Sequence, residues 1–285
     1  MSQSPIPRAL TIAGSDSGGG AGIQADLKSF TAFGVYGMTV VTAVTAQNTT
    51  GVQCSMELPL DIVEAQMRSV ASDIGVDATK TGMLASRELV ERVASLVQKL
   101  ELPNLVVDTV MIAKGGHPLL AEDAVSTVRE RLLPLARVVT PNLPEAGALV
   151  GRTVHSLDDA RKAARALRCA DGQWVVVKGG HLEDAAEAID IVFDGEEMTE
   201  LRSPRYLTRN THGTGCTFSA AIAAGLAQGH NPLQAIRRAK AYVDQAIRHA
   251  LSLGSGHGPT NHQVGMATPW SAPSSASAPD SRAEG

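Results

Sequence analysis

Short apolar segments rich in β-branched residues alternate with longer segments of helical periodicity, and this alternation restricts the fold more than any other feature. The apolar segments are almost continuously hydrophobic, as strands are when both faces of a sheet are buried. Helices placed between such strands make neighbouring strands parallel. We therefore predict an α/β fold with a mostly parallel central sheet and helices on both faces, with strands at residues 9–13, 39–46, 105–108, 137–140 and 175–178.

The region from residue 188 onward departs from this alternation. Residues 188–193 and 198–202 resemble two strands around Asp194-Gly195, a dipeptide typical of hairpin turns, so we expect an antiparallel edge. No repeat or linker divides the chain, and we predict a single domain over residues 1–265. Residues 266–285, rich in Pro, Ser and Ala, are expected to be a disordered tail.

Composition excludes several classes of protein. The 285 residues are 44% hydrophobic with a formal net charge of -4, which leaves no basic excess for a nucleic-acid backbone. No segment approaches the ~20 apolar residues that a membrane helix needs. The 3 cysteines form no C-x-x-C pair, which argues against a disulfide framework or a structural zinc site. We expect a cytoplasmic protein that acts on small molecules, with neither nucleic acid nor a membrane as partner.

A first glycine-rich loop, residues 14–22, lies between the first predicted strand and a helix expected over residues 23–33. Open α/β sheets bind ligands at the carboxyl ends of their strands, and clustered glycines let a ligand approach backbone amides. Residues 20–25 also match the G-x-G-x-x-A pattern of dinucleotide sites. Such a site needs an acidic residue at the end of the second strand, where this chain has Ala46-Gln47-Asn48. A turn that only packs strand against helix is the third possibility.

A second glycine-rich loop, formed by Gly213, Thr214, Gly215 and Cys216, leads into an alanine-rich helix. Its backbone amides and the helix dipole would favour an anion such as a transferring phosphoryl group. In the first turn of that helix, Cys216 should have a lowered pKa and could act as a general base. A small cysteine can equally fill a tight helix start. The loop alone leaves both interpretations open.

Polar residues follow three successive predicted strands and should meet at one edge of the sheet. Asp108 and Glu145 could hold Mg²⁺ directly or through water, Asn142 precedes Glu145, and Lys178 could neutralise phosphate. Asp26 would face the same crevice if the first helix begins at the end of its glycine loop, although such a carboxylate can also serve the helix dipole. With a possible phosphate-binding loop near each end of the chain, these groups favour phosphoryl transfer to a small acceptor.

Several of these segments together resemble a known family. From Arg8 to His262, and in the same order, the chain is similar to the bacterial hydroxymethylpyrimidine/phosphomethylpyrimidine kinases of thiamine biosynthesis. The segments that carry the resemblance are residues 10–28, 46–48, 107–111, 140–145, 178–181 and 210–217. The resemblance implies a ribokinase-like three-layer α/β sandwich, ATP and Mg²⁺ as cofactors, and a homodimer. It also implies two successive phosphorylations of 4-amino-5-hydroxymethyl-2-methylpyrimidine, first to the monophosphate and then to the diphosphate.

The same resemblance implies roles for individual residues. Gln47 would pair with the amino and ring-nitrogen edge of the pyrimidine, because a carboxamide offers a donor and an acceptor side by side. Cys216 would occupy the position of the catalytic base. The remaining implied roles are substrate binding by Gly14, Met83 and Val110, an anion hole of Gly213, Thr214, Gly215 and Cys216, ATP binding by Lys178 and Asn142, Mg²⁺ binding by Asp108 and Glu145, and catalysis by Lys178, Asp26 and Asp108 with Cys216.

Three other functions compete with this interpretation. A pyridoxal or pyridoxine kinase of the same superfamily would use the same anion hole, Mg²⁺ groups and cysteine, and Gln47 favours the aminopyrimidine over it. A nicotinamide-dependent oxidoreductase would use residues 20–25. A non-catalytic protein could bind the pyrimidine without turnover.

Overall fold

The computed structural model describes residues 6–111, 119–121, 123–180 and 187–266. Its centre is a nine-stranded sheet in the order β3-β2-β1-β4-β5-β6-β7-β8-β9. In this order, β2, β1, β4, β5, β6 and β7 each pair with the next in parallel. β3 is antiparallel to β2, β8 is antiparallel to β7, and β9 is antiparallel to β8. The strands are β1 (Arg8–Asp16), β2 (Tyr36–Asn48), β3 (Gly51–Glu57), β4 (Ala78–Thr81), β5 (Leu105–Val107), β6 (Val138–Val139), β7 (Trp174–Val177), β8 (Glu187–Phe193) and β9 (Met198–Pro204).

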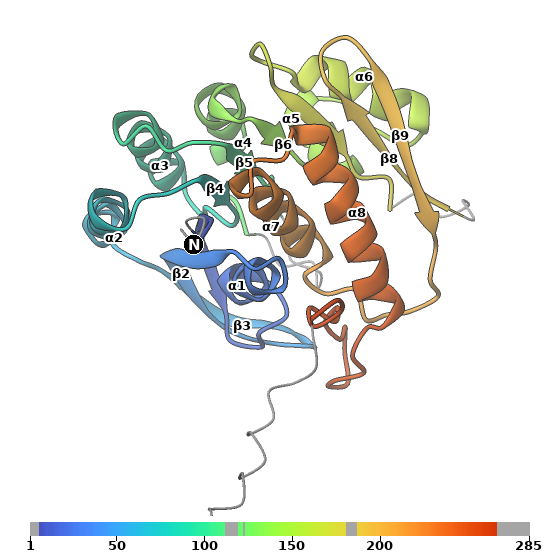
Figure 1. The fold of residues 1–285 in the computed structure, drawn as a ribbon, viewed down its shortest axis with the longest axis horizontal. Coiled ribbons are helices and arrows are strands. Elements are labelled where there is room, and N and C mark those ends of the chain that lie inside the picture. The colour runs from blue at the N-terminus through green and yellow to red at the C-terminus, as the bar shows by residue number, and fades with distance from the viewer. Residues whose placement is uncertain (1–5, 112–118, 122, 181–186, 267–285) are drawn as a thin grey trace, which may run out of the picture.

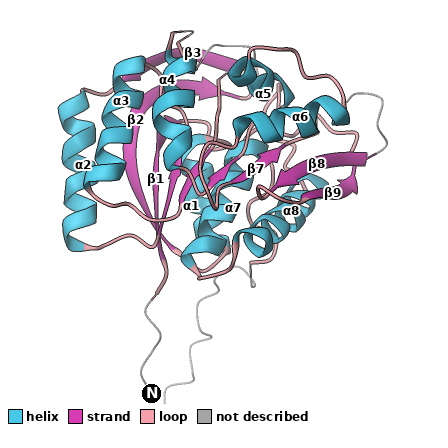
Figure 2. Ribbon diagram, turned by 90° about the horizontal axis from the view of Figure 1, so that it is seen from above, coloured by secondary structure: helices cyan, strands magenta, loops and turns pink. Residues whose placement is uncertain are grey.

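Helices cover both faces of the sheet, which makes the three layers (Figures 1 and 2). On one face lie α1 (Gly22–Ala32), α7 (Thr214–Ala227) and α8 (Pro232–Arg248). On the other lie α2 (Leu60–Asp73), α3 (Arg87–Lys99), α4 (Ala124–Thr127), a π-helical turn (Val128–Leu132), a 3₁₀ turn (Leu133–Leu135), α5 (Leu143–Val150) and α6 (Leu157–Leu167). The predicted α/β class and mostly parallel sheet are confirmed.

Alternate residues of the central strands enter two different hydrophobic cores. Val106, Val138 and Val176 pack under α1, α7 and α8, whereas Val107 and Val139 pack under the helices of the opposite face. Both sets are at most 1% exposed. Burial on both faces is the reason why these strands are nearly continuously apolar.

The hairpin prediction is confirmed, since β8 and β9 pair across Asp194-Gly195 from Phe193↔Met198 outward. The sequence pattern did not predict β3 or β4. The edge strand β3 is largely exposed and polar, and β4 reads Ala-Thr-Lys-Thr, which carries almost no apolar signal. All four residues of β4 are buried nonetheless, and a buried ion pair described below makes this possible for Lys80.

Two of the segments considered above fall partly outside the described residues. These are most of the predicted tail, residues 267–285, and His181 of the segment 178–181. Within the described ranges, no helix combines the length and apolar character that crossing a membrane requires.

Candidate active site

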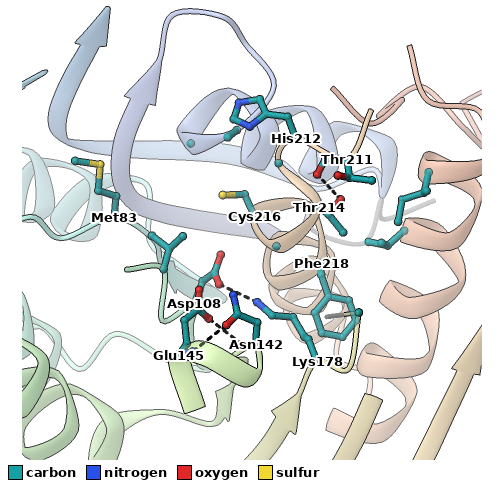
Figure 3. A pocket seen from close by; sticks show the side chains of 18 of the residues that line it. Met83, Asp108, Asn142, Glu145, Lys178, Thr211, His212, Thr214, Cys216 and Phe218 are labelled. Atoms are coloured by element: carbon teal, nitrogen blue, oxygen red, sulfur yellow. Dashed lines mark hydrogen bonds and ion pairs between the residues drawn. The ribbon is translucent and has the colours of Figure 1, made fainter. Parts of the chain in front are cut away.

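A cavity of about 690 Å³ opens where the parallel strands end. Strands β1, β5 and β7 lead directly into residues that line it, as expected for the carboxyl edge of an open α/β sheet. Figure 3 shows side chains from segments far apart in the sequence converging on it. Of the predicted site residues, Asp26 is outside the lining, which contains Gly14, Gln47, Met83, Asp108, Val110, Asn142, Glu145, Lys178, Gly213, Thr214, Gly215 and Cys216.

The two glycine-rich loops touch each other beside this cavity. Gly213, at the N-cap of α7, has a left-handed backbone with φ of 79°. A Cβ at this position would lie 1.7 Å from the carbonyl oxygen of Gly20 in the first loop. Only glycine permits both the backbone conformation and the close approach.

The second loop offers backbone amides to a ligand. The amides of Thr214 and Thr217 donate to acceptors within the loop, at 3.3 and 2.9 Å. Among the described residues, the amides of Gly215 and Cys216 have no acceptor. A Cβ on Gly215 would lie 3.4 Å from Lys178 Nζ, so a cation adjoins these amides. Free amides, the positive end of α7 and a lysine together suit a phosphate group.

The Cys216 side chain points from the start of α7 into the cavity (Figure 3). Burial is the largest influence on the thiol and raises its pKa to about 12, with Asp108 acting in the same direction and Lys80 against it. The predicted lowering of this pKa is therefore wrong, because desolvation outweighs the helix dipole. The resting side chain is a neutral thiol at pH 7.

The first glycine loop is organised around an internal carboxylate. Asp16 Oδ1 accepts a hydrogen bond from the Gly18 amide at 2.8 Å, and Oδ2 accepts from the amides of Gly20 and Ala21 at 3.0 and 2.8 Å. Burial opposes the charge, but His212 and these amides outweigh it and hold the pKa of Asp16 below its usual value. The amides that could have bound a phosphate or a dinucleotide are already used. This argues against a phosphate at the first loop and against the G-x-G-x-x-A alternative, which the sequence had left open.

Asp108 and Lys178 form an ion pair on the cavity wall (Figure 3). Lys178 Nζ lies 3.4 Å from Asp108 Oδ1, and Ser219 Oγ donates to Asp108 Oδ2 at 3.1 Å. Burial disfavours the lysine charge, but Asp108 and Glu145 outweigh it and raise the pKa of Lys178. Lys178 is therefore a permanent cation within the cavity.

Asn142 and Glu145 hold each other at the start of α5. Asn142 Oδ1 accepts from the Glu145 amide, and Glu145 Oε2 accepts from the Asn142 amide, both at 2.9 Å, which makes a capping box. Thr109 Oγ1 donates to the same Glu145 oxygen at 3.0 Å. Burial, and secondarily Asp108, raises the pKa of Glu145. The N-x-x-E segment therefore has a structural role as well as a place on the cavity wall.

Asp26 lies behind the wall of the cavity, not on it. It is fully buried, accepts from Thr11 Oγ1 at 2.6 Å, and pairs with Lys80 Nζ at 2.9 Å. Lys80 does line the cavity. Burial disfavours its charge, but Asp26, Cys216 and Asp108 outweigh it and raise the pKa of Lys80. Sequence reasoning missed Lys80, because β4 carries almost no apolar signal and its partner Asp26 lies 54 residues away.

Gln47, Met83, Val110 and Gly14 all line the cavity, and Gly14 belongs to the first loop. A Cβ on Gly14 would lie 3.1 Å from Met83 Sδ, so the glycine gives the methionine room. His212, also missed from the sequence, reaches Gln47 and Asp16 from the second loop. The only sequence signal for His212 was its position directly before Gly213 of the predicted anion hole.

Comparison with known proteins decides the family. The profile of the family described as phosphomethylpyrimidine kinase matches residues 16–261. The chain belongs to this family. The hydroxymethylpyrimidine/phosphomethylpyrimidine kinase of Streptomyces coelicolor is 54% identical over 256 residues, covering 90% of this chain and 94% of that protein.

Solved structures agree on the fold. The pyridoxal kinase of Bacillus subtilis, in an ADP complex, has a TM-score of 0.84 at 41% identity and covers 91% of this chain and 98% of its own. The phosphomethylpyrimidine kinase of Clostridium difficile 630 has a TM-score of 0.74 at 40% identity, covering 85% and 100%. The family resemblance, the ribokinase-like sandwich and the kinase class are confirmed. Backbone similarity does not separate the two substrate classes, because both kinases share the fold.

Proposed function

We propose that this protein transfers a phosphoryl group from ATP to 4-amino-5-hydroxymethyl-2-methylpyrimidine and then a second one to the resulting monophosphate. One observation carries the proposal: a single cavity joins Gln47 to the free amides of Gly215 and Cys216 and to Lys178. A carboxamide can pair with an aminopyrimidine edge, and the amides with the lysine can hold the transferring phosphoryl group. The names of the relatives in both comparisons support kinase chemistry of this kind.

Each residue has a distinct task in this proposal. Gln47 pairs with the ring edge while Met83 and Val110 enclose the ring. Lys178 neutralises the phosphates of ATP beside Gly215. Before the step, the Cys216 thiol releases its proton to solvent. The substrate hydroxymethyl oxygen then attacks the γ-phosphorus, the bond from that phosphorus to the ADP oxygen breaks, and the hydroxyl proton passes to the Cys216 thiolate.

Asp108 and Glu145 fit a divalent cation. Asp108 raises the pKa of Glu145, so the two carboxylates repel each other and a cation between them would relieve the repulsion. Mg²⁺ bound there would neutralise charge on the phosphates of ATP. In the described chain, no cluster of at least three His, Cys, Asp or Glu side chains forms a metal site of protein ligands alone, which agrees with an ion that keeps water and phosphate ligands.

Cys216 must lose its proton before it can accept one. With a pKa of about 12 the thiolate is a small fraction at neutral pH, and Lys80 is the cation that favours it. Asp26 positions Lys80 for this task and does not touch substrate. The second phosphorylation uses an anionic phosphate oxygen as nucleophile, so it needs no such base.

Pyridoxal is the second candidate substrate. The structure of the Staphylococcus aureus pyridoxal kinase with AMP-PCP and pyridoxal has a TM-score of 0.84 at 37% identity. Gln47 favours the aminopyrimidine, because pyridoxal lacks an adjacent amino group and ring nitrogen to pair with both ends of the carboxamide.

The test is ADP release from MgATP with either acceptor alone, with products followed by mass. Formation of the monophosphate and then the diphosphate of the pyrimidine is expected. Turnover of pyridoxal alone would overturn the substrate assignment, and turnover of neither would indicate a binding protein. Light scattering of the same sample would test the homodimer, which stays a prediction together with the cytoplasmic location.

Gln47→Leu tests the ring edge. The variant should raise KM for the pyrimidine by about 100-fold while KM for ATP changes little, because two hydrogen bonds to the substrate are lost. An unchanged pyrimidine KM would remove Gln47 from the substrate site.

A further inference from the structure

Gln47 lies between two fixed partners on the cavity wall. Its carboxamide nitrogen lies 3.2 Å from His212 Nε2, and its carboxamide oxygen lies 3.3 Å from Thr45 Oγ1. His212 Nε2 is also 3.0 Å from Asp16 Oδ2. Thr45 Oγ1 is 2.9 Å from the carbonyl oxygen of Ser15. A half-turn of the carboxamide exchanges its oxygen and nitrogen without moving any other atom, so the two partners decide which orientation is stable.

The proton on His212 is determined by Asp16. The pKa of Asp16 is lowered, so its carboxylate is ionised and only accepts hydrogen bonds. The facing nitrogen, His212 Nε2, must therefore carry a proton. A protonated ring nitrogen has no lone pair for the amino group of Gln47. The one Nε2 proton lies between Asp16 Oδ2 and the carboxamide, so the carboxamide atom next to His212 is favoured to be the oxygen, which shares this proton with Asp16.

Thr45 leads to the same orientation independently. Its hydroxyl has one proton, and the carbonyl oxygen of Ser15 at 2.9 Å is the closer acceptor. Thr45 Oγ1 can then only accept from its other neighbour at 3.3 Å. The carboxamide atom next to Thr45 is favoured to be the nitrogen, which is again the half-turned carboxamide.

We propose that His212, held by Asp16, and Thr45 lock the Gln47 carboxamide in one orientation and thereby make the site select a 4-amino over a 4-oxo pyrimidine. Both are positioning residues, and the proposal rests on the proposed function of Gln47. The two lateral contacts use one lone pair of the oxygen and one proton of the nitrogen. The outer edge keeps an acceptor on the His212 side and a donor on the Thr45 side.

The lock matters because an unrestrained glutamine could pair with both ring types by rotating its carboxamide through half a turn. A 4-aminopyrimidine offers an N–H next to a ring-nitrogen acceptor, and a 4-oxopyrimidine offers an oxygen acceptor next to a ring N–H. Against a locked edge, the oxo compound can pair only after its ring turns over, which carries the 5-hydroxymethyl group to the other side of the ring. The oxo compound is thus excluded from the pose that leads to reaction.

The experiment compares kcat/KM for 4-amino-5-hydroxymethyl-2-methylpyrimidine with that for its 4-oxo analogue. We expect the wild-type ratio to exceed ~1,000, because a site of matched hydrogen bonds strongly rejects a mismatched edge. His212→Phe and Thr45→Val should each lower the ratio by about tenfold, mainly through faster turnover of the oxo compound, since each removes one restraint of roughly 1–1.5 kcal/mol. His155→Phe, at an exposed position, is the matched control and should leave the ratio unchanged.

A gain of activity on the oxo compound cannot arise from general damage to the fold. If His212→Phe fails to fold, Thr45→Val decides alone. An unchanged ratio in the variants that fold, with the ratio lost in Gln47→Leu, would overturn the lock while the proposed pairing stands. Gln47→Leu with unchanged KM and unchanged ratio would overturn both.

Discussion

The two glycine-rich loops meet at Gly20 and Gly213, yet their backbone amides differ in whether the chain itself supplies an acceptor. In the first loop, the amides of Gly18, Gly20 and Ala21 donate to the Asp16 carboxylate. In the second, the amides of Gly215 and Cys216 keep no partner among the described residues. A cluster of glycines shows that backbone amides are accessible. Whether they bind an outside anion depends on whether the chain supplies its own.

The charges behind the loops differ as well. The first loop meets an internal anion, while the second faces two lysines, the buried Lys80 and the half-buried Lys178, each paired with one aspartate. A phosphate would therefore meet amides and cations at the second loop and a carboxylate at the first. The contact between the loops also brings His212 of the second loop to Asp16 of the first, so the internal anion has a task in shaping the substrate end of the cavity.

Gly213→Ala should break the contact between the loops and have the largest effect. The new Cβ would lie 1.7 Å from Gly20 O at a φ of 79°. We expect the free energy of unfolding to fall by about 4 kcal/mol, from left-handed strain and overpacking together. Chemical denaturation measures this. Gly229→Ala, with φ of 81° and open space around it, isolates the strain and should cost about 1 kcal/mol. Equal losses would contradict the steric contact.

Cys216→Ala tests the catalytic side of the second loop. We expect phosphorylation of the alcohol to fall by about 100-fold, as for a lost general base, and phosphorylation of the monophosphate to fall less. In the wild type, the rate of the alcohol step should rise with pH between 7 and 9 because the thiol has a pKa of about 12. Cys169→Ala, at an exposed cysteine, is the control. Equal loss in both steps would mean that Cys216 only shapes the anion hole.

Asp16→Ala tests whether the Asp16 carboxylate is the reason why the amides of the first loop, unlike those of the second, are not free to bind an anion. The variant leaves three amides without their acceptor, and we expect about 2 kcal/mol of lost stability. Added inorganic phosphate should then raise the Tm of the variant more than that of the wild type, because the freed amides can bind it. Asp73→Ala, on the exposed end of α2, is the control. Unchanged stability would show that the loop does not depend on the carboxylate.

The smallest expected effect is a pH dependence of stability due to His262, which contacts the helix turn that follows the second loop. Its Nε2 lies 2.9 Å from Thr217 Oγ1 in the first turn of α7, and burial lowers its pKa from 6.5 to about 4. Between these values the unfolded chain binds a proton that the folded chain does not, so stability falls as pH decreases from 6.5 toward 4. Between pH 6.5 and pH 5 we expect the wild type to lose about 1.5 kcal/mol more of its free energy of unfolding than His262→Gln does, as measured by chemical denaturation at both pH values. The exposed His155→Gln should leave the pH dependence unchanged; an equal change there would contradict the assignment.

Sequence patterns predicted the parallel strands whose residues are apolar on both faces, such as those around Val107, Val139 and Val177. They missed β4 because Lys80 and two threonines hide a buried strand. They placed Asp26 in the crevice because α1 does begin after the glycine loop, but its side chain turns toward the sheet and pairs with Lys80, 54 residues away. A partner so distant in sequence leaves no local signal at either residue.

The sequence by itself determined the alternation of strands and helices, the two glycine-rich loops, and the polar residues that follow the strands, because each depends on periodicity or on a short segment. Tertiary structure alone decided which amides remain free, the raised pKa of Cys216, and the orientation of Gln47. These depend on burial and on hydrogen bonds between distant segments, such as the one between Asp16 and His212, 196 residues apart. Local sequence patterns indicate most of the strands and helices, whereas the state of a proton or an amide is set by its neighbours in space.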